Sequence, residues 1–158
     1  MGTITKSEMI LAWAGFVLLT YKEKEPYIVL VKDKNGILGL PGGRVEHAEQ
    51  MINAGVREVR EEVNERIWAR TAKELWVGDT IYRNAPSVVF ALYLHLVPFF
   101  ESRTIANDDD IVEARTYSLP YVLNHMLDRD NKFKRKDKLL LQKVRDQLVL
   151  FLLPILHY

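Results

Sequence analysis

Three glutamates, Glu58, Glu61 and Glu62, lie close together near the middle of the chain. If Gln50 to Val63 forms a helix, their i, i+3 and i+4 spacing places all three on one face. At roughly 100° per residue, the aliphatic residues of the segment fall on the opposite side: Ile52, Val56, Val59 and Val63. Neighbouring carboxylates repel one another, and Mg²⁺ prefers carboxylate oxygens. The pattern therefore predicts either a solvated acidic face or a divalent-metal site.

The segment immediately before this helix contains two consecutive glycines. Leu40-Pro41-Gly42-Gly43 joins an apolar run to the expected helix. Pro41 restricts the backbone, whereas the glycines permit a close approach of the backbone to a ligand. A strand-to-helix loop of this composition favours a binding site over a solvated acidic face.

Together these residues resemble the Nudix box, the family pattern G-x5-E-x7-R-E-U-x-E-E-x-G-U, in which U is a bulky aliphatic residue. Seven specified positions agree with the pattern: Gly43, Glu49, Arg57, Glu58, Val59, Glu61 and Glu62. Glu46 and the loop before the box also look like the family's usual approach. Two positions depart from the pattern. Asn64 replaces a glycine but can still end a helix in the left-handed conformation, and Glu65 replaces an aliphatic residue.

The resemblance implies a metal-dependent hydrolase and a role for each box residue. Mg²⁺, or Mn²⁺ in its place, would be held by Glu58, Glu61 and Glu62, helped by Glu49 and the Gly42 carbonyl. Arg57 would orient a glutamate of the cluster, with Glu49 as a plausible partner. Catalytic roles are expected for Glu58, Arg57 and Glu61, and Glu61 is the first choice for the base within the helix.

The family also brings an acidic residue from a later loop over the helix as a further metal ligand or base. Here Asn107-Asp108-Asp109-Asp110, followed by Glu113, forms such an acidic segment. Asn and Asp equally suit a solvated turn. Within this segment we expect Glu113 or Asp110 to take the functional role.

The expected reaction is cleavage of the diphosphate linkage of a nucleoside diphosphate joined to another group. A nucleoside triphosphate, a dinucleoside polyphosphate and a nucleotide sugar all fit this description. Two alternatives stay open: inositol pyrophosphate hydrolysis, and a non-catalytic Nudix-like module that binds a nucleotide. The absence of cysteine disfavours the isopentenyl diphosphate isomerases of the same fold. The resemblance also implies a cytoplasmic location.

Composition and charge agree with one α/β Nudix domain over residues 1–158. The chain is 48% apolar and 27% charged, which suffices for a real core. A net charge of +1 provides no domain-wide basic field, so nucleic acid is not the expected partner, although an RNA end is not excluded. No apolar run reaches the length of a membrane helix.

Alternating and apolar runs predict a sheet around the helix. Strands are expected at 10–21, 27–32, 37–40, 76–82, 87–97 and 114–118, with turns at Lys22 to Pro26 and at Asn35-Gly36. In the strand at 87–97, Phe90 and its neighbours at i±2 look like core, and the other face could line a cleft. His95 on that face is more often a satisfied sheet histidine than a ligand. The order of elements favours a mixed sheet between helices, which is the Nudix α/β/α sandwich by resemblance.

The last part of the chain combines a basic run with an apolar helix. Lys132 to Lys138 holds five basic side chains, which suits a solvated helix entry or a contact with polyphosphate or RNA, with Phe133 available for stacking. A helix is expected from about 137 to 156, and its apolar end would either pack under the sheet or form a homodimer interface. Five aromatic residues could stack on a base but are more often core: Trp13, Phe16, Tyr82, Tyr93 and Phe133.

Overall fold

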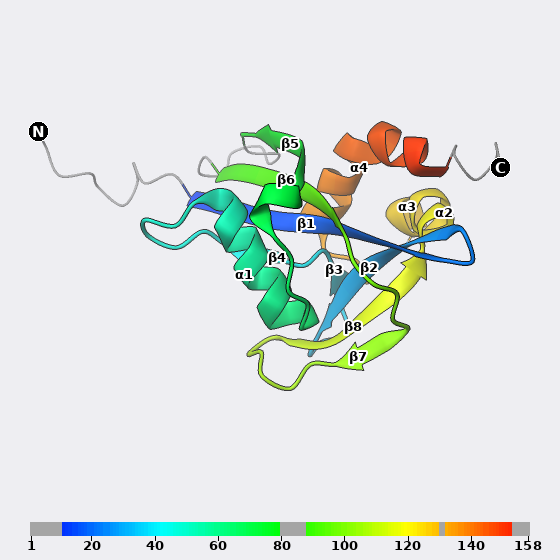
Figure 1. Cartoon of the computed structure of the whole chain (residues 1–158), viewed down its shortest axis with the longest axis horizontal. Helices are drawn as coiled ribbons and strands as arrows, with labels where there is room; N and C mark the ends of the chain where they lie inside the picture. The colour runs from blue at the N-terminus through cyan, green and yellow to red at the C-terminus, as the bar shows by residue number, and fades with distance from the viewer. Residues whose placement is uncertain (1–10, 80–87, 130–131, 153–158) are drawn as a thin grey trace, which may run out of the picture.

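The computed structural model of the chain describes residues 11–79, 88–129 and 132–152. Within these ranges eight strands form one mixed sheet in the order β5-β6-β1-β2-β8-β7, with β3 paired to β2 and β4 paired to β1 (Figure 1). The strands are β1 Leu11–Lys22, β2 Glu25–Asp33, β3 Leu38–Gly39, β4 Gly42–Arg44, β5 Lys73–Gly78, β6 Val88–Leu96, β7 Ser102–Thr104 and β8 Ile111–Ser118.

The central strand β1 has neighbours of both orientations. It runs antiparallel to β2 through a tight turn at Glu23 and Lys24, both of which have positive φ, and parallel to β6. A parallel partner requires a long crossover connection, and here that connection contains the helix α1, Met51–Val63. The predicted mixed sheet is therefore confirmed. Because β4 pairs with β1 and α1 packs against β1, the loop before the helix and the helix itself lie side by side.

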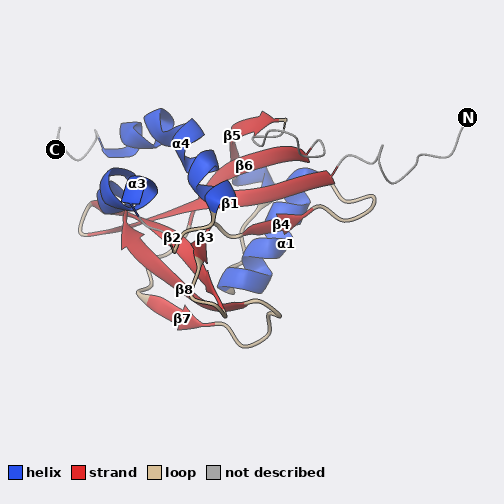
Figure 2. Ribbon diagram, turned by 180° about the vertical axis from the view of Figure 1, so that it is seen from behind, coloured by secondary structure: helices blue, strands red, loops and turns tan. Residues whose placement is uncertain are grey.

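Helices cover both faces of the sheet (Figures 1 and 2). On one face lies α1, and on the other lie α4, Arg135–Val149, and a continuous helical stretch made of α2 Leu119–Tyr121, η3 Val122–Met126 and α3 Leu127–Arg129. Short 3-10 turns are present at η2, Ala69–Thr71, and η4, Leu150–Leu152. This is the expected Nudix α/β/α fold. Across the described residues, no helix is long and apolar enough to cross a membrane.

The two faces of β6 both belong to a core, which corrects the expectation that one of them lines a cleft. Phe90, Leu92 and Leu94 pack on the α4 side, whereas Ala91 and Tyr93 pack under α1. Because an α/β/α sandwich buries both faces of its central strands, the alternation of β6 does not separate core from solvent.

Several boundaries differ from the predicted ones. The strand β5 begins at Lys73, three residues before Trp76, and the predicted residues beyond 79 lie outside the described part. More consequential is β8, which begins at Ile111 instead of Ala114, so Glu113 belongs to a strand and not to a loop. The last helix begins at Arg135, and the predicted residues 153–156 also lie outside the described part.

The C-terminal end of α1 explains both departures from the box pattern. Asn64 has φ 59° and ψ 40°, and its N–H donates to the Arg60 carbonyl, so it is a left-handed C-cap as predicted. Arg103 of β7 donates to the carbonyls of Val63 and Asn64 at 3.1 and 3.2 Å and forms an ion pair with Glu65 at 3.2 Å. A polar pair thus replaces the aliphatic contact usual at position 65.

This cap gives a stability prediction. Asn64→Ala should lower the free energy of unfolding by about 1 kcal/mol, because alanine tolerates the left-handed conformation less well than asparagine. Asn64→Gly should change it by no more than a few tenths of a kcal/mol. Urea unfolding of the two variants measures the difference, and equal stability of the alanine and glycine variants would contradict the proposed role of the backbone conformation.

Candidate active site

The loop before α1 is held against the helix by its glycines. Gly42 and Gly43 pair with Gly15 and Ala14 of β1, and the Gly42 N–H donates to Glu62 Oε1 at 2.8 Å. A Cβ atom on Gly43 would overlap the carboxylate of Glu58. Only glycine therefore leaves room for Glu58 at this position, and the loop and the acidic side of α1 form one unit.

Arg57 organises the acidic side chains around it. Its guanidinium binds both oxygens of Glu49, with Nε at 2.9 Å and an Nη atom at 3.1 Å. The other Nη atom lies 3.0 Å from Glu58 Oε1 and 3.4 Å from Glu61 Oε2. Arg57 also donates to the Arg44 carbonyl at 3.1 Å. The contact predicted between Arg57 and Glu49 is present, and it fixes a planar fork with contacts to three box glutamates.

The pKa of Glu49 is shifted in the opposite direction from those of Glu58 and Glu62. The hydrogen bond from Arg57 holds the pKa of the Glu49 carboxyl below its ordinary value, so Glu49 is ionised and engaged through both oxygens. The two oxygens in contact with Arg57 favour an orienting role for Glu49 over direct ligation of a cation.

Glu58 and Glu62 are in the opposite situation. Glu62 is only 8% exposed, and burial raises its pKa to about 8, with smaller raising effects from Glu58 and Asp108. Burial also raises the pKa of Glu58, an effect that Arg57 partly offsets and that Glu61 and Asp108 reinforce. Burial thus disfavours the ionised form of two neighbouring carboxyl groups. Glu62 was expected on the open acidic face, but it lies at the buried boundary between α1 and the glycine loop.

A divalent cation fits this donor set. Over the described residues, no three Asp, Glu, His or Cys side chains already converge in a metal-ligand arrangement. Mg²⁺ nevertheless needs only one or two carboxylates, completed by water and phosphate oxygens. A dication beside Glu58 and Glu62 would favour the ionised form of both carboxyl groups and so offset the effect of their burial.

The acidic loop contributes a different residue from the two expected. Glu113 lies on β8 beside Ala114, whose side chain packs under α1, so successive side chains place Glu113 on the other face of the sheet. There it forms ion pairs with Lys32 and Arg115 at 3.7 and 3.4 Å. Asp110 pairs with Lys134 at 3.8 Å.

Asp108 is the loop acid whose charge acts on the box. It raises the pKa values of both Glu58 and Glu62. Its carboxylate is held in place because Oδ2 accepts hydrogen bonds from the Asp110 and Ile111 N–H groups at 3.0 and 2.6 Å. The acidic run in the sequence includes Asp108, but the sequence alone does not single it out from its neighbours.

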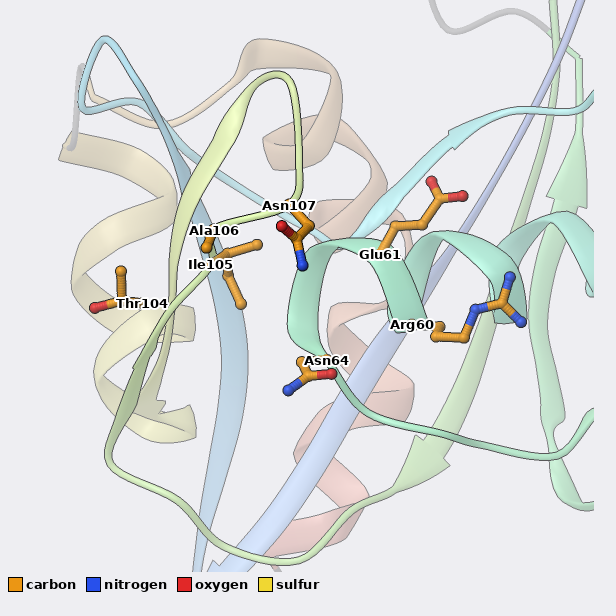
Figure 3. A pocket seen from close by; sticks show the side chains of 7 residues that line it. All are labelled: Arg60, Glu61, Asn64, Thr104, Ile105, Ala106 and Asn107. Carbon is orange, nitrogen blue, oxygen red and sulfur yellow. The ribbon is translucent and has the colours of Figure 1, made fainter.

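A pocket of about 310 Å³ adjoins this cluster (Figure 3). It lies between the last turns of α1 and the segment that follows β7, and it is lined by Arg60, Glu61, Asn64, Thr104, Ile105, Ala106 and Asn107. Glu61 is 44% exposed and lines this pocket, whereas Glu62 faces the glycine loop. The two neighbouring glutamates therefore face different surroundings.

The other aromatic and histidine candidates are accounted for by packing. Trp13, Phe16, Tyr93 and Phe133 are all buried, so none is exposed for base stacking, and Tyr82 lies outside the described residues. His95 Nε2 lies 2.6 Å from Thr71 Oγ1, and its Nδ1 lies 2.6 Å from the Leu96 carbonyl oxygen. His95 is a satisfied sheet histidine, as expected.

The raised pKa of Glu62 gives a pH-dependent prediction for the metal-free protein. Glu62 ionises near 4.5 when unfolded and near 8 when folded, so the folded state holds an extra proton between these values. Stability should therefore fall as the pH rises through this window. Glu62→Gln keeps an acceptor for the Gly42 N–H but carries no charge. At pH 8 with EDTA we expect its Tm to exceed that of the wild type by about 5 °C.

The same pair of proteins provides the control at low pH. Near pH 4.5 the Glu62 carboxyl is protonated in the folded wild type, so the Tm difference should largely disappear. Thermal unfolding followed by circular dichroism measures both values. A Tm difference that is the same at both pH values would show that Glu62 does not carry this linkage.

The family of the chain follows from the box geometry together with a sequence-family match. The NUDIX domain family matches residues 12–141, which includes the glycine loop, α1, the acidic loop and the first half of α4. The chain therefore belongs to the NUDIX domain family. Among curated proteins, none matches the chain.

Solved structures with this fold are numerous. The NUDIX domain of Shewanella oneidensis NrtR, complexed with ADP ribose, is 20% identical over 89% of each chain, with a TM-score of 0.67. A C. elegans Ap4A hydrolase in a binary complex is 17% identical over 87% of this chain and 98% of that one, with a TM-score of 0.59. A MutT NUDIX hydrolase from Burkholderia pseudomallei is 26% identical over 84% and 98%, with a TM-score of 0.55. At such low identity the first two of these likenesses concern the fold alone.

Proposed function

We propose that this chain is a divalent-metal-dependent hydrolase that cleaves the diphosphate linkage of a nucleoside diphosphate joined to another group. The observation that carries the proposal is the desolvated pair Glu58 and Glu62, which the glycine loop and Arg57 hold beside Glu61, a residue that lines the pocket. Phosphoryl chemistry consists mainly of positioning and charge neutralisation, and this arrangement suits both.

The residues divide into three roles in this proposal. Glu58 and Glu62, with Glu61 and the Gly42 carbonyl at their sides, would hold Mg²⁺ or Mn²⁺. When bound, the metal supplies charge neutralisation of the diphosphate and activation of a water molecule. Arg57 keeps Glu58 and Glu61 in place, and Glu49 fixes the orientation of Arg57 through two hydrogen bonds.

Glu61 accepts the proton of the attacking water in this proposal. Its side chain is the most exposed of the three helix glutamates and lines the pocket, so a water molecule can reach it. Asp108 replaces Glu113 and Asp110 as the loop acid, because its charge acts on the carboxylate pair whereas Glu113 pairs with Lys32 and Arg115 on the other face.

The test is turnover over a broad panel of diphosphates. It includes nucleoside triphosphates, ADP ribose and other nucleotide sugars, Ap4A and other dinucleoside polyphosphates, and inositol pyrophosphates. The compounds bound or hydrolysed by the structural neighbours, ADP ribose and Ap4A, guide this choice. We expect turnover that requires Mg²⁺, is abolished by EDTA and falls at least about a hundredfold in Glu61→Gln.

A binding-only module is the alternative that the same panel distinguishes. Nucleotide binding by calorimetry without turnover of any compound would replace the hydrolase with a non-catalytic role. Turnover that is equal in the wild type and in Glu61→Gln would keep the hydrolase and assign the base elsewhere, with Asp108→Asn as the next variant.

A further inference from the structure

The basic run at the start of α4 is fixed beside the glycine loop. The Leu38 N–H donates to the Lys132 carbonyl at 2.6 Å, and the Lys134 N–H donates to the Leu38 carbonyl at 2.8 Å. Phe133 between them is 4% exposed and pairs with Leu38 in a parallel bridge. This run is therefore an ordered extension of the sheet next to β3 (Figure 2), and not a free basic segment.

A second contact ties the first turn of α4 to the same loop. Asp137 is 1% exposed, and its Oδ2 accepts a hydrogen bond from the Leu40 N–H at 3.2 Å. A Cβ atom on Gly39 would overlap this oxygen, so a glycine is required where the carboxylate reaches the backbone. Lys134, just before this turn, and Lys136, within it, are consequently held close to the segment that leads into the box.

Two lysine side chains of the run lie beside the segment from Gly39 to Gly42. Lys136 Nζ lies 4.1 Å from the centre of the Trp13 ring and 3.6 Å from Asp137 Oδ1. Lys134 Nζ lies 3.8 Å from Asp110 Oδ2, and its side chain is 38% exposed. The Trp13 ring under Lys136 lies against Gly42, and the Lys134 side chain lies against Gly39, so both lysines stand beside the segment that leads into the box.

These two lysines retain capacity for an anionic ligand. Each ammonium carries three donors, and the ion pairs at 3.6 and 3.8 Å are longer than a charge-assisted hydrogen bond. Asp110 and Asp137 thus engage only part of the donor capacity of these lysines, so each ammonium group can still donate to an anionic ligand.

We propose that Lys134 and Lys136 bind a phosphate group of the substrate that lies beyond the linkage addressed by the box carboxylates. The inference rests on the proposed function and narrows its substrate class to compounds with a chain or cluster of phosphates. A nucleotide sugar would place an uncharged group against two ammonium ions. Such a group would not offset the free-energy cost of removing water from either ion. A further phosphate accepts hydrogen bonds from both.

Binding of inorganic tripolyphosphate tests the proposal directly. Calorimetry with Mg²⁺ is carried out in a Glu61→Gln background, so that the probe is not consumed, and imidodiphosphate serves as a two-phosphate comparison. Lys134→Gln should weaken tripolyphosphate binding about tenfold, which is the scale of one charge-assisted hydrogen bond. Its binding of imidodiphosphate should change by less than about twofold.

Three further variants guard against indirect effects. Arg135→Gln removes one positive charge from an exposed position of the same run and should leave both affinities within about twofold. Lys136→Met keeps the aliphatic stem on Trp13 and should weaken tripolyphosphate binding about tenfold. Lys136→Arg should restore it, because the charge and the contact with the ring are retained. Thermal unfolding verifies that each variant is folded.

The outcomes separate this inference from the hydrolase itself. Equal weakening by Lys134→Gln and Arg135→Gln, or no weakening by either, would overturn the phosphate site and leave only a general basic field. Absence of tripolyphosphate binding by the parent protein would also overturn it. Mg²⁺-dependent turnover confined to nucleotide sugars and unchanged in Lys134→Gln would keep the hydrolase and reject the inference. Selective loss of tripolyphosphate binding without any turnover would reject the hydrolase and support the phosphate site.

Discussion

Glu58→Gln and Glu62→Gln are each expected to lower Mg²⁺-dependent turnover at least about a thousandfold, because each variant removes one of the two desolvated carboxylates that would hold the metal. Both substitutions keep the size of the side chain, and the Glu62→Gln variant retains an acceptor for the Gly42 N–H. The loss should therefore come from charge and not from collapse of the loop. Values of kcat and kcat/KM over a range of Mg²⁺ concentrations, with the best substrate of the panel, measure the effect.

The metal dependence of these variants is as informative as their rates. A lost ligand should shift the Mg²⁺ requirement to higher concentration, which a purely structural defect would not do. Glu101→Gln is the matched control, since Glu101 is exposed and lies away from the box on the other side of β7. Activity of Glu58→Gln and Glu62→Gln within about tenfold of the wild type would remove both residues from the proposed metal site.

Arg57→Gln is expected to lower the stability of the fold as well as the activity. Arg57 contacts Glu49, Glu58 and Glu61, and its side chain is mostly buried. Its loss leaves three carboxylates close together without their cation, which should lower the free energy of unfolding by about 3 kcal/mol. Because Glu58 and Glu61 would no longer be held, kcat should fall at least about tenfold. Urea unfolding and steady-state kinetics measure the two effects.

Arg57→Lys distinguishes the effect of the positive charge from the effect of the guanidinium geometry. Arg57→Lys keeps the positive charge but cannot form the planar fork to Glu49 and Glu58, so it should recover stability better than activity. Arg66→Gln, at an exposed position beyond α1, provides the charge-matched control and should change neither quantity appreciably. If Arg57→Lys were as active as the wild type, the guanidinium geometry would have no role in positioning the glutamates.

Local patterns in the sequence identified most of the secondary structure. The helix predicted at 50–63 is α1, Met51–Val63, and Asn64 ends it in the left-handed conformation as expected. The turn around Glu23 and Lys24 also lies where it was predicted. These features depend on residues that are near one another in the chain, namely helical periodicity, turn residues and caps, and such information is present in the sequence itself.

Residues at the boundary between elements were predicted less well. Glu113 was expected in a loop but belongs to β8, because the strand begins three residues earlier and pairing with β2 continues to Asp33. That single boundary places Glu113 on the face opposite α1, and the loop acid whose charge raises the pKa values of Glu58 and Glu62 is Asp108. Phe133 was considered for base stacking but judged more often a packing residue, and its contact with Leu38 does bury it.

The sequence by itself determined the box, because glycines, glutamates and an arginine at fixed spacing on one loop and one helix define it without reference to the rest of the chain. Tertiary structure decided which outside residues join it. Asp108 comes from the acidic loop, and Lys134 and Lys136 come from the start of α4, about seventy residues beyond Glu62 in the sequence. Their approach depends on the pairing of β8 with β2 and on the docking of residues 132–134 against β3. Such long-range contacts follow from burial and packing of the whole sheet, and no local pattern encodes them.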